Sequence, residues 1–106
     1  MRIAIPRAID VGGVTYQVSW DDKAREDLKN EVCSGRCNKQ GLWIHLDPVI
    51  PRVGAVFLHE VTHCIDYEYC HNGLSENDVD AVATGLAQVL KQLGIEFVLE
   101  DEVASP

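Results

Sequence analysis

Two histidines, His59 and His63, stand four residues apart, and Glu60 directly follows the first. On a helix, side chains at this spacing lie about 40° apart around the axis and about 6 Å apart along it. Both imidazoles can therefore bind one Zn²⁺ at about 2.1 Å and leave a coordination position for water. Glu60 flanks the same polar side, so we expect it to be the general base for that water and not a ligand. The alternative is a surface helix whose histidines and glutamate only contact solvent.

The third metal ligand is expected on the next helix in the sequence. Asp80 flanks the apolar stripe of that helix, and several small residues follow it, which lets the two helices approach closely. We therefore predict that Asp80 completes the site with His59 and His63. Glu76, one turn earlier on the same side, is the alternative ligand. In the competing interpretation Asp80 is a solvated acid on the flank of the helix.

Three residues that follow the motif are candidates for supporting roles. Asp66 shares the face of the histidines but lies about 10 Å from His59 along the helix axis, too far for both to bind one ion. We expect its carboxylate to accept a hydrogen bond from a ligand imidazole. Tyr67 and Tyr69 are candidate hydrogen-bond donors to an oxyanion, and the competing interpretation for each is a packed aromatic residue.

The four cysteines have two interpretations. In a reducing compartment free thiols are the default, and this is the expectation here. The alternative is a second zinc site that uses Cys33, Cys37, Cys70 and His71. The spacing of Cys33 and Cys37 falls in the range of zinc ligands, whereas the Cys70-His71 pair does not form a standard zinc knuckle.

Size and charge narrow the possible partners. The chain has 106 residues, which suits one domain spanning 1–106, and its 17 acidic against 9 basic residues give a net charge of -8. Such a surface repels a phosphate backbone, so we expect no nucleic-acid partner. No apolar run approaches the roughly 18 residues of a membrane span, and residues 1–10 lack the apolar region of a signal peptide. We therefore expect a cytoplasmic protein without a membrane partner.

The first half of the chain predicts strands around one helix. A tight hairpin is expected at Gly12-Gly13, followed by a strand to residue 20 with one buried face. A helix over about 21–32 has a thin apolar stripe, which predicts a surface position. Residues 30–41 are expected to form a loop, and 42–46 a short strand.

The second half predicts two long helices. The pattern is helical from Val53 to about Tyr69, and a second helix begins at the N-cap Ser75, with Asp78 closing a capping box, and ends near Gly94. A short strand or an acidic tail follows. The expected core stripe of the second helix consists of Val79, Val82, Leu86, Val89, Leu90 and Leu93.

Four segments carry a resemblance to a known group of proteins: "IPRAIDVGGVTYQVSW", "LWIHLD", "FLHEVTHCIDYEY" and "LSENDVDAVATGLAQVL". With them the chain resembles the very small HExxH metallopeptidase-like proteins of phages and prophages, beside the minigluzincins and the ImmA/IrrE-type metallopeptidases. The resemblance implies an α+β fold with a minimal zincin-like (gluzincin) core, in which "LWIHLD" is an edge strand. It also implies an acidic third ligand from the second helix, usually Glu with a small residue three positions on. Asp80 with Ala83 fits that placing, although aspartate is one methylene shorter.

The leading functional expectation is a zinc-dependent metallopeptidase of gluzincin type, with one Zn²⁺ per chain and a peptide or protein substrate. The edge strand over 42–46 is expected to pair with an extended peptide, as in β-augmentation. The alternative is a catalytically silent, metal-stabilised regulatory or adaptor protein that binds a partner protein. Glu60 favours the first, because a purely structural site needs no carboxylate beside an open coordination position.

The acidic carboxyl-terminal segment offers further oxygen ligands. Glu100, Asp101 and Glu102 are three carboxylates in a row, so one hypothesis is that this tail occupies the cleft and inhibits the site. The alternative is a solvated terminus.

Overall fold

The structure is a computed structural model that describes residues 1–100. Its four-stranded sheet has the order β2-β3-β5-β4, formed by β2 (Ala8–Val11), β3 (Val14–Ser19), β5 (Trp43–Leu46) and β4 (Gly35–Asn38). The outer pairs are antiparallel, whereas β3 and β5 run parallel. Gly12 and Gly13 both have positive φ, as a two-residue hairpin of type I′ requires, so the predicted turn between β2 and β3 is confirmed.

A smaller parallel pair joins the two ends of the described chain. β1 (Arg2–Ala4) pairs with β6 (Glu96–Val98), in the register Ile3 opposite Phe97. The predicted strand after the last helix is therefore confirmed. Together with α1 (Asp22–Glu31), α2 (Val53–Tyr69) and α3 (Glu76–Gln92), these strands make an α+β fold, as expected from the sequence.

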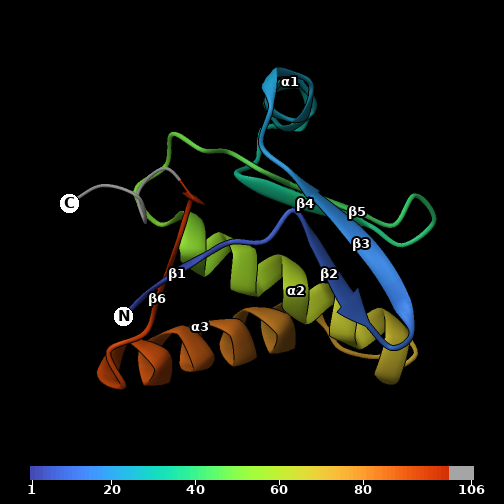
Figure 1. The fold of residues 1–106 in the computed structure, drawn as a ribbon. Coiled ribbons are helices and arrows are strands. Elements are labelled where there is room, and N and C mark those ends of the chain that lie inside the picture. The colour runs from blue at the N-terminus through green and yellow to red at the C-terminus, as the bar shows by residue number, and fades with distance from the viewer. Residues whose placement is uncertain (101–106) are drawn as a thin grey trace.

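The α2 helix is the centre of this arrangement. It packs against strands of both sheets on one side and against α3 on the other, so the layers run sheet, α2, α3, while α1 lies at the far side of the sheet (Figure 1). The bounds of α2 are those predicted from the sequence. The main core lies between α2 and the sheets; its most buried residues are Ile5, Val11, Tyr16, Val18, Ile44, Leu46, Val53, Phe57 and Cys64.

Two predictions about the strands are wrong. Residues 30–41 are not all loop, because β4 lies within them, and the strand over 42–46 is not an edge strand, because β5 pairs with β3 on one side and β4 on the other. The β4 segment Gly-Arg-Cys-Asn has no alternating hydrophobic pattern, so its sequence gave no strand signal. It is held by tertiary contacts: Gly35 lies so close to α2 that a Cβ atom there would be 2.5 Å from Val56 Cγ1.

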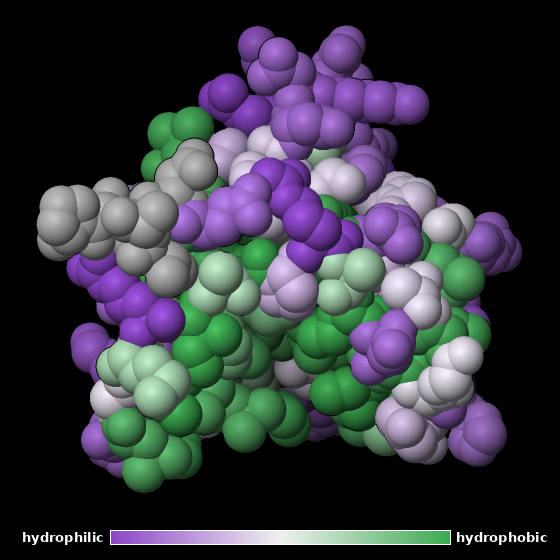
Figure 2. Space-filling view, viewed as in Figure 1, coloured by the Kyte–Doolittle hydropathy of each residue, from purple (hydrophilic) through white to green (hydrophobic). Residues whose placement is uncertain are grey.

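The predicted core stripe of α3 is only partly correct. Val79 is fully buried against α2 and Leu90 is half-buried, but Val82, Leu86, Val89 and Leu93 are 45–68% exposed. Ala83 is the second buried residue of the helix. The stripe is wider than the strip of surface that α2 covers, and within residues 1–100 no other element packs closely on α3. Figure 2 shows hydrophobic residues gathered over the lower left of the molecule, where α3 lies in Figure 1.

Candidate metal centre

The two histidines of the HExxH motif meet a carboxylate of α3. His59 Nε2 lies 3.0 Å from Glu76 Oε1, and His63 Nε2 lies 3.2 Å from Glu76 Oε2. Within residues 1–100, these three side chains are the one group of potential metal ligands whose donor atoms all lie within 4.8 Å of one another. The prediction that both histidines present their rings on one side of α2, toward α3, is confirmed.

The dimensions of this group suit a metal ion. In a tetrahedral zinc site with ligand bonds of 2.0–2.1 Å, neighbouring donor atoms are roughly 3.3 Å apart. The two nitrogen–oxygen distances are close to that value before any rearrangement. Two imidazoles and a carboxylate are also a donor set that zinc commonly uses, with a further position left for water. The residues present therefore fit a divalent metal ion of this kind.

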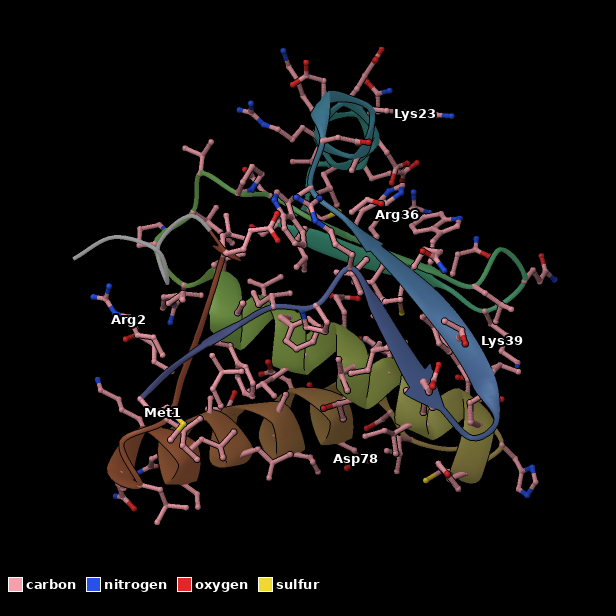
Figure 3. All side chains as sticks on the ribbon, viewed as in Figure 1. Met1, Arg2, Lys23, Arg36, Lys39 and Asp78 are labelled. Carbon is pink, nitrogen blue, oxygen red and sulfur yellow. The ribbon has the colours of Figure 1, made fainter. Side chains whose placement is uncertain are left out.

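Local sequence explains why Glu76 reaches the histidines. Ser75 is the N-cap of α3 and accepts a hydrogen bond from the Asp78 amide, while the Asp78 carboxylate accepts one from the Ser75 amide. This capping box confirms the prediction and fixes where the helix begins. Glu76 is then the first helical residue and extends toward the C-terminal half of α2. Figure 3 shows Asp78 at this end of α3, where the helix passes beneath α2.

Asp80, the ligand expected first, lies on the other side of the His59 ring. Its Oδ1 is 3.6 Å from Nδ1 of His59, not from the Nε2 that faces Glu76. That distance is an ion-pair contact and is too long for a good hydrogen bond. A carboxylate in this place orients the imidazole and favours the tautomer whose Nε2 can bind a metal. The structure thus groups the alternative residue, Glu76, with the two histidines and brings Asp80 to the outside of the group.

The Glu60 side chain is buried between α2 and β4, on the flank of α2 next to His59. It is only 6% exposed, and burial, reinforced by the neighbouring Cys37, raises the pKa of its carboxyl to about 8. The close approach of Gly35 creates this environment, since a Cβ atom at that position would be 3.1 Å from Glu60 Oε2. A buried carboxyl with a raised pKa next to a metal ligand is a candidate general base or acid.

A cleft of about 310 Å³ opens beside these groups. Its walls come from the start of β4, from α2 and from α3, and include Gly35, Val56, His59, Glu60 and Asp80. Both His59 and Glu60 border the cleft, so a molecule bound there would reach the candidate metal ligand and the candidate base at once. The cleft is the feature that lets the site act on a ligand and not only hold an ion.

The two tyrosines have different environments. The ring of Tyr67 stacks on that of His63 with a centroid distance of 6.3 Å, and its hydroxyl lies 3.8 Å from Cys37 Sγ. Burial raises the pKa of the Tyr67 hydroxyl, so that it stays protonated. Tyr69 is exposed in the last turn of α2. Of the two candidate donors, Tyr67 is the one that borders the histidines.

Asp66 stabilises the turn between α2 and α3 and does not face a candidate metal ligand. Its carboxylate accepts a hydrogen bond from the Leu74 amide, and its main-chain carbonyl accepts from Cys70 and Asn72. The side chain is almost fully buried. Asp66 therefore holds the turn that brings α3 back along α2. It positions Glu76 through the backbone, whereas the expected hydrogen bond was to an imidazole.

All four cysteines are free thiols, and the structure does not gather Cys33, Cys37, Cys70 and His71 into one site. Cys37 instead contacts the buried Cys64, and the hydrogen bond to Cys64 together with burial raises the pKa of the Cys37 thiol. Its neighbour Glu60 also hydrogen-bonds it. Sequence reasoning missed this contact, because Cys37 lies in a strand that its own residues do not predict.

Of the three carboxylates of the acidic tail, the structure describes that of Glu100. Glu100 forms a 2.6 Å ion pair with Arg7, whose guanidinium lies over the ring of Trp20. This carboxylate is thus engaged away from the histidines. Asp101 and Glu102 lie outside the described residues, so the proposed inhibitory tail stays a hypothesis.

Two general comparisons complete the description of the site. Among the described helices, none is both long and apolar enough to cross a membrane. Compared with protein families, with curated proteins and with solved structures, the chain shows no match to any family model, protein or structure.

Proposed function

We propose that this chain is a zinc-dependent hydrolase of peptide bonds with a minimal zincin-like core. The observation that carries the proposal is that two imidazole nitrogens converge on one carboxylate at 3.0 and 3.2 Å, and that the buried Glu60 carboxyl shares a cleft with one of these histidines, His59. The resemblance of the "FLHEVTHCIDYEY" segment to the very small HExxH metallopeptidase-like proteins of phages and prophages supports the metal site. The proposed ligands are His59, His63 and Glu76.

His59, His63 and Glu76 would hold the zinc ion, which would supply Lewis-acid chemistry and lower the pKa of a bound water. Glu60 takes the proton of the attacking water and returns it to the leaving amine. Its buried position keeps the carboxylate poorly solvated, which makes it a stronger base than an exposed glutamate. Asp80 holds the His59 ring in place, and Tyr67 packs against His63.

A peptide is the proposed substrate because the edge strand β4 of the sheet lies at the cleft. β4 is the last strand of its sheet, and the start of β4 lines the same cleft as His59 and Glu60. An extended peptide can pair with the free edge of such a strand through main-chain hydrogen bonds, independently of its own sequence. The peptide-binding strand is therefore proposed to be β4, in place of the segment over 42–46 that the sequence suggested.

Metal analysis of carefully purified protein tests the ligand set. We expect one zinc per chain, and loss of the ion in His59→Ala. Glu76→Gln should weaken zinc affinity by several orders of magnitude, because it removes a charged ligand, whereas Asp80→Asn should cost about 10–100-fold, the usual effect of a group that orients a ligand. The reverse order would make Asp80 the ligand, and unchanged zinc content in His59→Ala would refute the site.

Cleavage of a peptide library tests the activity. Glu60→Gln keeps size and hydrogen bonding, so zinc content and folding should survive while hydrolysis falls by about 10²-fold or more. Equal activity of wild type and Glu60→Gln would mean that a contaminant cleaves the peptides. A wild-type protein that holds zinc but cleaves nothing would instead support a metal-stabilised adaptor.

A further inference from the structure

The outer face of α3 carries an apolar surface that nothing in the described chain covers. We define the α3 stripe as Val82, Leu86, Val89 and Leu93, all exposed. The spacing alternates between four and three residues, which places these side chains along one narrow line of the helix. Large aliphatic residues in such a line are the pattern of a helix that packs lengthwise against another helix. The stripe extends from residue 82 to residue 93, so the surface is roughly 17 Å long.

We propose that the α3 stripe is a homodimer contact, in which the α3 helices of two copies pack antiparallel around a two-fold axis between Leu86 and Val89. In that register Val82 meets Leu93 of the second copy, and Leu86 meets Val89. Each layer then combines one valine with one leucine, so the layers have equal volume along the contact. A parallel pair would instead alternate small valine layers with large leucine layers. The stripe is thus complementary to itself in the antiparallel direction.

Charge selects the same direction. The acidic residues of α3, Glu76, Asp78 and Asp80, all lie in its first turns, no charged residue occurs over 81–90, and Lys91 lies in the last turn. Parallel helices would place the three acids beside their copies. Antiparallel helices place the two acidic first turns at opposite ends of the contact, so the acids of one copy do not lie beside those of the other. Opposed helix dipoles favour the same arrangement.

Gly85 is a second, independent indication that another helix packs against this face of α3. A glycine in the middle of a helix is destabilising relative to alanine, so it usually marks a close contact. Within the described chain a Cβ atom at Gly85 would meet nothing within 4 Å. The fold itself therefore gives no reason for a glycine there. Gly85 flanks the α3 stripe on the side away from α2, where a second backbone could approach closely.

A contact of one helix face from each copy is smaller than the roughly 800 Å² per partner of a standard interface. We therefore expect reversible dimerisation in the micromolar range, not an obligate dimer.

Sedimentation equilibrium of the full chain, from micromolar to near-millimolar concentrations, tests this proposal. Wild type should shift from monomer to dimer, and high salt should strengthen the association because it screens the charge of -8 on each copy. Leu86→Asp should weaken the association by at least about 100-fold, because it places two charges at the apolar centre of the contact. Circular dichroism should show that this variant is folded, since Leu86 is half-exposed in the monomer.

Gln88→Asp is the matched control, with the same new charge on the opposite side of the helix. It should change the association less than about threefold, the scale of a screened charge outside the contact. Val89→Asp provides a second disruption should Leu86→Asp fold poorly. A wild-type protein that stays monomeric at the highest concentration overturns the proposal. So does a dimer that survives Val89→Asp, or equal weakening by Val89→Asp and Gln88→Asp. Zinc content has no part in these outcomes, so they do not depend on the proposed hydrolase activity.

Discussion

The α2 and α3 helices have the same length of 17 residues, and each contains one glycine, yet the fold treats them very differently. α2 lies between strands of both sheets and α3, and it contributes Val53, Phe57 and Cys64 to the main core. Among the described elements, α3 packs mainly on α2, and its buried residues are Val79 and Ala83. The helix with the more regular apolar stripe is therefore the less buried one.

This difference shows what hydrophobic periodicity does and does not predict. The period identifies a helix and the face that would gain from burial. It does not say whether an element of the same chain covers that face. In α3 the inner edge of the stripe meets α2, while the outer edge remains exposed. Two features of the molecule, a group of potential metal ligands and an exposed apolar face, thus lie on neighbouring sides of one helix.

The largest expected effect is on core packing. Phe57 in α2 is buried and packs edge to face on Phe97, so Phe57→Ala should lower the free energy of unfolding by about 3–5 kcal/mol. Leu86→Ala in α3 should cost less than about 1 kcal/mol, because its side chain is already half-exposed. Urea denaturation at low protein concentration, where the chain is monomeric, measures both. Comparable losses would mean that α3 is as buried as α2.

Replacing each of the two helical glycines by alanine should change the free energy of unfolding in opposite directions. A Cβ atom at Gly54 in α2 would overlap the main-chain carbonyl oxygen of Phe97 in β6, so Gly54→Ala should destabilise the protein by about 1–3 kcal/mol. Gly85 in α3 has open space, and Gly85→Ala should stabilise the monomer by about 1 kcal/mol through helix propensity. Thermal and urea unfolding test the pair. A loss of monomer stability in Gly85→Ala would show that α3 has a neighbour within its own chain.

The smallest effect concerns how the last turn of α2 is tied to the sheet. Glu68 accepts hydrogen bonds from Lys39 and Tyr16, and these hold the pKa of its carboxyl below the ordinary 4.5. Since the folded-state pKa is the lower one, this contribution is present above about pH 5 and is lost as pH falls through the folded-state pKa. Glu68→Gln should therefore be less stable than wild type at neutral pH and converge with it in acid. Parallel stability curves between pH 2 and 7 would contradict this role.

Much of the fold was predictable from local chemistry. The Gly12-Gly13 turn, the strand over 42–46, the bounds of α2 and the Ser75 capping box all depend on residues close in sequence. β4 was not predictable, because its residues form a strand only through pairing with β5 and the close approach of Gly35 to α2. The segment 42–46 was predicted to be an edge strand because β4, which pairs with its outer side, was not predicted.

The candidate site likewise has one part that the sequence predicts and one part that it does not. The facing of His59 and His63 follows from helix geometry, because four residues make slightly more than one turn. The choice between Glu76 and Asp80 does not, since both lie on one flank of α3 and differ in where they stand along α2. The connection held by Asp66 fixes that offset, and it brings Glu76 to Nε2 of both histidines and Asp80 to Nδ1 of one.

By itself, the sequence determined the chemistry available to this protein: two imidazoles and a carboxylate on one helix, acids at the start of the next, and an apolar stripe of regular spacing. These are consequences of helical periods and capping, which act over a few residues. Only the tertiary structure decided which acid faces the histidines, that Glu60 is buried against β4, and that α3 keeps most of its stripe exposed. Those outcomes depend on how far the helices slide along each other and on which strand forms the edge. They are set by packing between residues far apart in the chain, which no local pattern encodes.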